Sequence, residues 1–252
     1  MKHNFSFVHF KEIDSTNTEA ARRIDESKED SVFSLVISAD YQKTGRGRGI
    51  KKFASIGQDS IYMSVIRKAE RYSAFITFSA AIAVCEVLKK ILSPEEASGL
   101  GIKWVNDIQL NGKKICGILV EQHGSGIIIG VGININISED EKYISEDEVK
   151  QIAGGICINP MDIPELRMLL AESIIETYER LIADGVEEEA RILEEYKALE
   201  ITTGKRILVK KPGKKPVVAR ALSINNNGAL KVSYENGTLE NLTAGEVSII
   251  QG

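Results

Sequence analysis

Hydrophobic positions recur along the chain at two different spacings. Apolar or alternating runs at residues 5–10, 33–38, 60–66 and 126–137 predict strands. Apolar residues at helical spacing predict helices at residues 73–92, from residue 162 to residue 182, and at about residues 187–199. The first of these helices is apolar almost all round, so we expect it to be buried against a sheet. Helices and strands mixed in this way predict an α+β protein.

From residue 204 onward the pattern contains short strands alone. They are expected at residues 206–210, 217–222, 229–234, 238–242 and 247–250. Asn-Gly pairs at residues 227–228 and 236–237 favour hairpin turns between them. So many strands in so short a segment predict a small β-barrel. We therefore expect two domains, residues 1–202 and residues 203–252.

Composition narrows the class of protein. With a net charge of −4 over 252 residues, the chain is not expected to be a general nucleic-acid binder. Cys85, Cys116 and Cys157 are odd in number and far apart, which predicts reduced thiols in a cytoplasmic protein and not disulfides or a zinc site. No apolar run is long enough to span a bilayer, and residues 1–5 do not resemble a signal peptide.

The least ordinary segment is GRGRG at residues 45–49. Its glycines leave the backbone free to approach a ligand, and Arg46 and Arg48 supply forked cations suited to phosphate or carboxylate. The spacing fits neither a P-loop nor a dinucleotide-binding fingerprint. We interpret the segment as a clamp that closes over an anion. A solvated basic loop between two strands is the alternative.

Ser15, Thr16 and Asn17 lie where the first strand should give way to a helix. Such a corner gathers hydroxyls, an amide and free N–H groups, which together can bind a small polar head group. Thr16 and Glu19 also have the spacing of a capping box, so a well-capped helix is the alternative.

Asn111-Gly112 lies between two apolar runs and predicts a tight hairpin. The hairpin would bring Asp107 near Lys114, a pair suited to Mg²⁺ and to a phosphate or carboxylate oxygen respectively. A cross-strand ion pair on the surface is the alternative. Gly117 suggests a bulge or the close approach of a ligand. Lys114 and Gly117 have opposite parity, so a bulge would be needed for both to serve one site.

The strand expected at residues 126–137 has two unlike faces. Its odd-numbered positions from residue 129 on are isoleucine or valine, which predicts a core. Gly130, Gly132, Asn134 and Asn136 share the other face and would make a flat, hydrogen-bonding floor for a ligand. Tight packing of a helix over the glycines is the alternative.

Taken together, these segments resemble the biotin–protein ligases over nearly the whole chain. The resemblance is carried by DSTN at residues 14–17, Gln42 with GRGRG at 45–49, KWVND at 103–107, KICGILVE at 114–121 and GVGIN at 130–134. It implies a mixed β-sheet flanked by helices, followed by a small SH3-like barrel. It also implies a form that lacks the N-terminal helix-turn-helix domain of regulatory members, because the catalytic segment begins within the first few residues. No DNA partner is therefore expected.

The resemblance implies a two-step reaction. Biotin and ATP, with Mg²⁺, give biotinyl-5′-AMP, and a lysine of a biotin carboxyl carrier domain then accepts the biotin and releases AMP. Catalytic roles fall to Lys114, Arg48 and Asp107, the last as the Mg²⁺ ligand. The residues expected to bind biotin are Ser15, Thr16, Asn17, Gln42, Gly45, Arg46, Lys114, Gly117, Gly130 and Gly132. The residues expected to bind the nucleotide are Arg46, Arg48, Lys51, Phe53, Asn106, Lys114 and Asn134.

Three positions depart from the family pattern. Phe53 stands where tryptophan is usual, Lys51 where arginine is common, and Val105 where proline is usual. The first two bear on ATP affinity, because a smaller ring stacks over less area and lysine lacks the bidentate fork of arginine. A lipoate–protein ligase is the nearest alternative, and a non-catalytic biotin or nucleotide binder is the alternative from another class. The exposed strands and glycine loops are also compatible with a homodimer.

Overall fold

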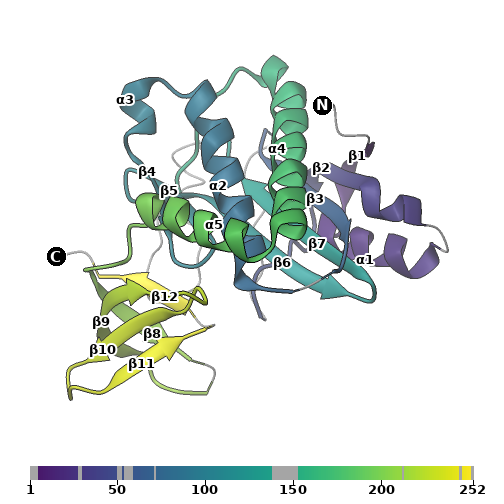
Figure 1. The fold of residues 1–252 in the computed structure, drawn as a ribbon. Coiled ribbons are helices and arrows are strands. Elements are labelled where there is room, and N and C mark those ends of the chain that lie inside the picture. Colours follow the sequence, from purple (N-terminus) through teal and green to yellow (C-terminus); the bar gives the residue numbers. More distant parts are fainter. Residues whose placement is uncertain are drawn as a thin grey trace.

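Two β-sheets organise the chain (Figure 1). The structure, a computed structural model, describes residues 5–27, 30–49, 53, 59–70, 72–137, 153–211, 213–243 and 246–250. The larger sheet has seven strands in the order β1-β2-β3-β7-β6-β5-β4. They are β1 (Ser6–Ile13), β2 (Leu35–Gln42), β3 (Ile61–Lys68), β4 (Leu100–Lys103), β5 (Asp107–Leu110), β6 (Lys113–His123) and β7 (Gly126–Ile133). β1 and β2 are parallel and every other neighbouring pair is antiparallel, so the sheet is mixed, as expected.

Helices cover both faces of this sheet because its strands send alternate side chains into two cores. On one face, α1 (Thr16–Glu26) buries Ala20 and Ile24 in a small cluster that includes Ile128 of β7. On the other face, Ile127 and Ile129 belong to the main core, which α2 (Ala74–Ile91) and α4 (Ile163–Asp184) cover. α5 (Val186–Leu199) packs against α2 (Figure 1). The short helices are η1 (Asp30–Ser34), α3 (Pro94–Ala97) and η3 (Pro160–Asp162). α2 is apolar on nearly every side because it lies between the sheet and two other helices.

The C-terminal sheet has five antiparallel strands in the order β11-β10-β9-β8-β12. They are β8 (Arg206–Lys210), β9 (Val217–Ile224), β10 (Leu230–Tyr234), β11 (Leu239–Leu242) and β12 (Glu246–Ile249). All the strands expected in this segment are present, with small shifts at their ends. The pairings among the described residues leave β11 and β12 as two edges, so they define a small β-sheet and do not show a closed barrel.

Trp104, between β4 and β5, joins the two sheets. Its indole Nε1 donates to the carbonyl oxygen of Gly228 at 3.1 Å, in the turn between β9 and β10. Gly228 has a φ of 83°, and a Cβ on it would lie 3.1 Å from the ring of Phe78 in α2. The Asn-Gly turn predicted at residues 227–228 therefore also seats the C-terminal sheet against the main core. The peptide bond between Trp104 and Val105 is cis.

β7 is shorter than the sequence predicts. It ends at Ile133, and beyond it Ile135 makes an isolated parallel bridge to Ile156. Asn136 takes a φ of 50° and bonds the backbone N–H and carbonyl of Ile158. The expectation of a strand to residue 137, with Asn134 and Asn136 on its polar floor, is therefore wrong. The apolar residue Ile135 is still buried beyond the end of the strand, in the isolated bridge.

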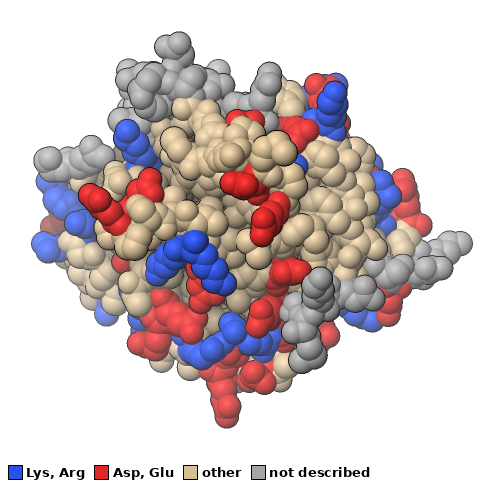
Figure 2. All heavy atoms as spheres, turned by 90° about the horizontal axis from the view of Figure 1, so that it is seen from above, with Lys and Arg blue, Asp and Glu red and all other residues tan. Residues whose placement is uncertain are grey.

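The surface carries charges of both signs. Figure 2 shows acidic and basic side chains interspersed on one face of the molecule, without a continuous basic area there. Cys85 and Cys116 are buried and Cys157 is exposed, and all three are free thiols, as expected. Within the part of the chain that the structure describes, no helix is long and apolar enough to cross a membrane.

Candidate active site

The β5–β6 hairpin turns at Asn111 and Gly112, which have φ values of 52° and 77°. This confirms the predicted tight turn. Its register shifts by one residue, because Ile108 pairs with Cys116 whereas Gln109 pairs with Lys114. The extra residue is a β-bulge, and it turns Lys114 to the face on which Gly117 lies. A Cβ on Gly117 would be 3.3 Å from the Lys114 ammonium, so the expected convergence of the two positions occurs.

Asp107 lies between two lysine ammonium groups. Nζ of Lys114 is 2.6 Å from its Oδ1 and Nζ of Lys103 is 2.9 Å from its Oδ2. Burial acts to raise the pKa of Asp107, but Lys114 and then Lys103 outweigh it and hold that pKa well below its usual range. Lys103 is itself buried and was not among the predicted site residues. Asp107 and Lys114 therefore do not form a surface ion pair. They belong to a cluster of three charged residues, of which Asp107 and Lys103 are almost wholly buried.

Two facing glycines cross the sheet beside this ion cluster, and we call this strip, which carries no side chains of its own, the trough. Tyr62 of β3 is in register with Gly132 of β7, which is in register with Gly117 of β6. Gly117 is in turn opposite Asp107 of β5. Since neither glycine has a side chain, the sheet surface is open between Tyr62 and Asp107. Gly132 is one of the residues predicted to form a ligand floor, whereas Gly117 beside it was predicted to mark a bulge or the close approach of a ligand.

The ring of Phe53 lies in this trough. A Cβ on Gly132 would be 2.5 Å from its Cζ, and a Cβ on Gly117 would be 2.9 Å from its Cε2. The ring meets Tyr62 edge-on, with centroids 6.2 Å apart, and its centroid is 5.9 Å from Nζ of Lys114. Phe53, expected to stack on an adenine, therefore covers the glycine floor in this structure.

Phe53 also holds the start of the glycine loop. Its N–H donates to the carbonyl oxygen of Gly45 at 2.8 Å. A Cβ on Gly45 would be 2.3 Å from the Phe53 carbonyl oxygen, so only glycine fits where these two backbones meet. Lys51, expected to bind nucleotide, lies outside the described residues.

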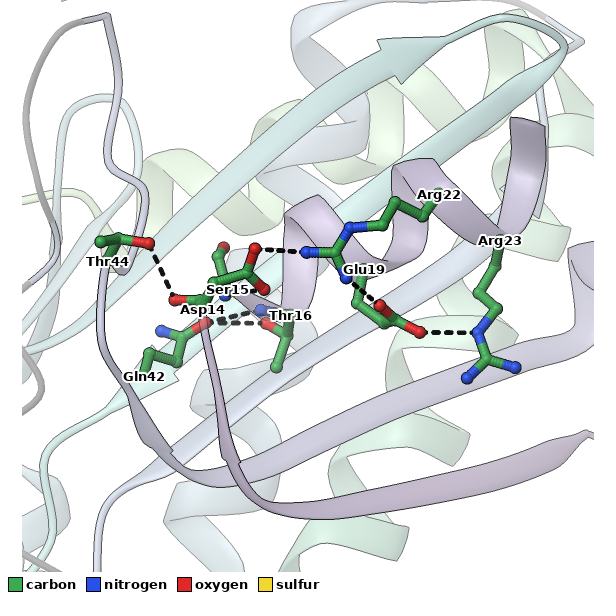
Figure 3. Close-up of polar contacts among 8 residues, drawn as sticks. All are labelled: Asp14, Ser15, Thr16, Glu19, Arg22, Arg23, Gln42 and Thr44. Atoms are coloured by element: carbon green, nitrogen blue, oxygen red, sulfur yellow. Dashed lines mark hydrogen bonds and ion pairs between the residues drawn. The ribbon is translucent and has the colours of Figure 1, made fainter. Parts of the chain in front are cut away.

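A polar corner lies where β1 ends and α1 begins (Figure 3). Ser15 is the N-cap of α1 and Thr16 is its first residue, and both are buried. Oε1 of Gln42 accepts from the backbone N–H of Thr16 at 2.8 Å and from its hydroxyl at 3.2 Å. Gln42 reaches the helix start because β1 and β2 are parallel, with Ile13 opposite Gln42. The structure thus brings together three predicted site residues from segments far apart in the sequence.

The expected capping box is absent from α1, whose N-cap makes no side-chain hydrogen bond. The carboxylate of Glu19 instead accepts from Arg22 and Arg23, and Arg22 also bonds Asp14 (Figure 3). Burial opposes ionisation of Asp14, but the hydrogen bonds from Arg22 and from the backbone N–H of Ser15, with the charge of Arg22, together outweigh it and lower the pKa of Asp14. Glu19 therefore pairs along the helix and does not reach back to the N-cap of α1.

Asn17 is held inside the protein at both ends of its amide. Its Oδ1 accepts from the hydroxyl of Ser64 at 2.6 Å, and its Nδ2 donates to Oε2 of Glu121 at 2.8 Å. A Cβ on Gly130 would be 2.2 Å from Oδ1 of Asn17, so this glycine admits the asparagine. Oε1 of Glu121 pairs with the guanidinium of Arg46 at 2.6 Å. Ser64 and Glu121 were not among the predicted site residues, because no local pattern in β3 or β6 marks either of them.

Arg46 of the glycine loop pairs with Glu121, beyond the polar corner. Burial raises the pKa of Tyr196 in α5 well above its usual value, and the charge of Arg48 acts against that rise. The hydroxyl of Tyr196 donates to the carbonyl oxygen of Val105 at 3.0 Å, in the turn that precedes Asp107.

The two predicted asparagines hold backbone segments. Nδ2 of Asn106 donates to the carbonyl oxygen of Ile118 at 2.5 Å, which ties the hairpin to the turn before it. Nδ2 of Asn134 donates to the carbonyl oxygens of Gly154 at 3.0 Å and Lys114 at 3.5 Å. Oδ1 of Asn134 is buried and has no hydrogen-bond partner in the described structure. That oxygen is available to a donor or a cation that enters beside Lys114.

The arrangement suits a flat ligand with a polar head and an anionic end. The glycine floor accepts a ring, the corner at Thr16 and Gln42 offers hydroxyl and amide groups, and Lys114 supplies a positive charge at the far end. A cavity of about 920 Å³ lies away from these residues, between β1, β2 and the start of α4. It shares no residue with the corner, the floor or the ion cluster.

Comparisons with known proteins converge on one family. Residues 9–138 match the sequence profile described as the Biotin/lipoate A/B protein ligase family. The chain is 26% identical over 217 residues to the Biotin--[acetyl-CoA-carboxylase] ligase of Mycobacterium tuberculosis, which covers 84% of this chain and 78% of that protein. It is 27% identical over 248 residues to the Bifunctional ligase/repressor BirA of Escherichia coli, which covers 94% of this chain and 72% of that protein.

A solved protein structure has a similar fold. A biotin protein ligase from Aquifex aeolicus, in complex with biotin and ATP, superimposes with a TM-score of 0.75 and 22% sequence identity. The match covers 98% of this chain and 99% of that one. At this identity the likeness establishes the fold, including the small C-terminal β-sheet.

Proposed function

The chain belongs to the biotin/lipoate A/B protein ligase family, and we propose that it is an ATP-dependent biotin–protein ligase. It forms biotinyl-5′-AMP from biotin and ATP and then transfers biotin to a lysine of a biotin carboxyl carrier domain, releasing AMP. The observation that carries the proposal is the trough over Gly117 and Gly132, which has a hydrogen-bonding corner at one end and the Lys114–Asp107 cluster at the other. The relatives named as biotin ligases support the same substrate.

Biotin would lie with its bicyclic ring over the glycines and its ureido group in the corner. A ureido group has two N–H donors and one carbonyl acceptor, so it needs partners of both kinds. Ser15, Thr16 and Gln42 supply hydroxyl and amide groups there, in a buried setting where each hydrogen bond counts for more. The dithiolane of lipoate has no comparable hydrogen-bonding head, so this corner favours biotin. Phe53 would have to leave the floor for the ring to enter.

The valeryl carboxylate of biotin would then point toward Lys114. Attack of that carboxylate on the α-phosphate of ATP forms the mixed anhydride and releases pyrophosphate, and negative charge accumulates between the two groups. The Lys114 ammonium would stabilise this charge, while Asp107 holds that ammonium in place. Arg48 would contribute from the glycine loop. Closure of that loop would exclude water from the anhydride.

The nucleotide would lie between Lys114 and the turn around Asn106. In this proposal Arg46, Arg48, Lys51 and Lys114 face its phosphates, Asn134 offers its buried oxygen, and Phe53, once displaced, covers the adenine. Mg²⁺ would enter with ATP as part of that substrate. Asp107 does not fit the role of its ligand, because both carboxylate oxygens are engaged by lysines. Within the described residues no cluster of three or more His, Cys, Asp or Glu could hold a metal ion.

The second half-reaction needs a protein acceptor. We infer a biotin carboxyl carrier domain, since one similar protein is named for acetyl-CoA carboxylase. The three free thiols support a cytoplasmic setting. A homodimer and the lack of a DNA partner remain predictions.

Pyrophosphate release tests the proposal. The protein is incubated with ATP, Mg²⁺ and either biotin or lipoate, and release is followed by a coupled assay. We expect release with biotin and background release with lipoate. Adding a biotin carboxyl carrier domain should give a labelled carrier and continuous turnover, which a carrier whose acceptor lysine is replaced should not. Release with lipoate alone would identify a lipoate ligase, and biotin binding without any release would identify a non-catalytic binder.

A further inference from the structure

We propose that Glu121 is a positioning residue, which fixes Arg46 of the glycine loop relative to the corner that receives the ligand head group. This inference rests on the proposed function, because it names the head group of biotin as the ligand that the fixed arginine helps to retain. It assigns a role to the last residue of the KICGILVE segment, which lies four residues beyond Gly117 on β6 and opposite Ile128 of β7.

The carboxylate of Glu121 bridges two elements. Its Oε1 is 2.6 Å from a terminal nitrogen of Arg46, and its Oε2 accepts from Nδ2 of Asn17 at 2.8 Å. The side chain of Glu121 is 26% exposed, whereas that of Arg46 is 46% exposed. The glutamate is therefore the better fixed partner, and it holds a guanidinium that comes from a glycine-rich loop with little packing of its own.

Asn17 is fixed in turn by the sheet beneath it. Ser64 donates to its Oδ1, and Gly130 leaves the space that its amide fills. Asn17 is 4% exposed, and both ends of its amide are engaged within the protein. Its role is therefore to orient Glu121 rather than to contact biotin directly, which revises the role expected from the sequence.

The same hydroxyl continues the network into the corner. The backbone N–H of Thr16 donates to Oε1 of Gln42, and Oγ1 of Thr16 is 2.8 Å from Oγ of Ser64, whose proton is donated to Asn17. A series of polar contacts thus runs from Gln42 to Arg46, through Thr16, Ser64, Asn17 and Glu121. A ligand that bonds Thr16 or Gln42 acts on one end of this series, and the loop arginine lies at the other.

Arg46 keeps N–H donors that no described residue uses and that a ligand could bind. A guanidinium carries five N–H groups, and Glu121 is the one partner of Arg46 among the described residues. Holding one edge of the fork fixes its plane while the other edge stays available to an anion or a carbonyl. Only a carboxylate can accept from both Arg46 and Asn17, because a glutamine of the same shape would turn its NH₂ group toward one of the two donors.

A double-mutant cycle tests this. The dissociation constant of biotin is measured by titration calorimetry for the full chain and for Glu121→Gln, Arg46→Ala and the double variant, with thermal midpoints alongside. We expect Glu121→Gln to weaken biotin binding about tenfold when Arg46 is present and less than about twofold in the Arg46→Ala background. Glu12→Gln is the matched control, since Glu12 forms an ion pair of the same 2.6 Å length with Lys43 outside the network. It should leave the dissociation constant unchanged.

Equal losses in both backgrounds would overturn the inference, because Glu121 would then act without Arg46. An unchanged affinity in Glu121→Gln would overturn it as well. A lowered thermal midpoint with equal losses would show that Glu121 is structural. Failure of the proposed function is seen separately, in the wild-type protein: biotin binding without pyrophosphate release would reject the ligase assignment while the cycle still reports on Glu121.

Discussion

Gly117 of β6 and Gly132 of β7 lie directly opposite each other, and the ring of Phe53 covers both. A pair of facing glycines leaves a gap in the side-chain cover of a sheet, and an aromatic ring is wide enough to fill it. A ligand ring lying on the same glycines would need the same surface. Phe53 and the ligand therefore compete for the floor of the site.

Substituting Gly132 should be costly because of Phe53. A Cβ at this position would lie 2.5 Å from the ring, so Gly132→Ala should lower the free energy of unfolding by about 1–3 kcal/mol, as overpacking does. In a Phe53→Ala background the same substitution should cost little. Urea unfolding of the four proteins measures both values. An equal cost in the two backgrounds would mean that the ring is not what excludes a side chain.

Lys114→Ala should stop adenylate formation far more than it weakens biotin binding. The ammonium is most needed when charge builds up in the transition state, so the loss belongs in kcat, by about 100-fold or more. Single-turnover pyrophosphate release and biotin calorimetry separate the two effects. Lys113→Ala is the neighbouring control, because Lys113 is exposed and lies outside the ion cluster. A wild-type rate in Lys114→Ala would leave Lys114 as a purely structural partner of Asp107.

The ionised form of Asp107 should stabilise the fold in a defined pH range. Its pKa is lowered in the folded protein from an ordinary value of 3.8, so the unfolded chain takes up a proton first as the pH falls. The stabilisation is therefore complete above about pH 5 and is lost as the pH falls through 3.8 toward the lower folded pKa.

Asp107→Asn keeps the size of the side chain and removes its charge. It should be less stable than wild type by about 3 kcal/mol at pH 7, because Lys103 then has no buried counter-charge. Urea unfolding between pH 3 and pH 7 should show this difference shrinking below about pH 4. A difference that grows on acidification would contradict the lowered pKa of Asp107.

Thiol labelling should modify one cysteine rapidly and the other two slowly. Burial raises the pKa of Cys85 to about 12 and that of Cys116 well above its usual value, and both side chains are out of contact with solvent. Cys157 is exposed. Iodoacetamide at pH 8 should therefore alkylate one thiol per native chain and all three in urea, read by intact mass. Rapid native labelling of two thiols would contradict the packing of α2 on β6.

The sequence was sufficient for features that depend on neighbouring residues. The hairpin at Asn111-Gly112 follows from two residues that accept positive φ, and the bulge follows from the parity of Lys114 and Gly117. The fold class and the order of elements follow from periodicity and from the family resemblance, which the comparisons confirm. The end of β7 was missed because alternation persists into the bridge at Ile135.

Contacts between distant segments could not be read in the same way. Glu121 meets Asn17 and Arg46 across 104 and 75 positions of sequence, and no local pattern marks it as a partner of either. In the sequence, nothing distinguishes Lys103 from a surface lysine. The structure shows that it is the second cation that contacts Asp107. The polar corner was found because its residues cluster at one turn, whereas the residues that orient it are spread over three strands.

Arg48 should retain the intermediate that the enzyme makes. The glycine loop contributes little apolar surface, so the ligand over which it closes must supply the free energy of ordering it. Arg48 supplies a guanidinium whose forked N–H groups suit the phosphate of an adenylate held by Lys114. We therefore expect Arg48→Gly to form some biotinyl-5′-AMP and release it into solvent, where it acylates exposed lysines of other proteins.

The measurements are the dissociation rate of the adenylate and the biotin labelling of albumin added to the reaction. Both should rise at least about tenfold over wild type, since one charge-assisted contact to a phosphate is lost. Lys43→Ala is the control, because its ammonium pairs with Glu12 at the surface, and its rates should match those of wild type. An unchanged dissociation rate in Arg48→Gly, with albumin unlabelled, would mean that Arg48 does not hold the intermediate and that the glycine loop is no clamp.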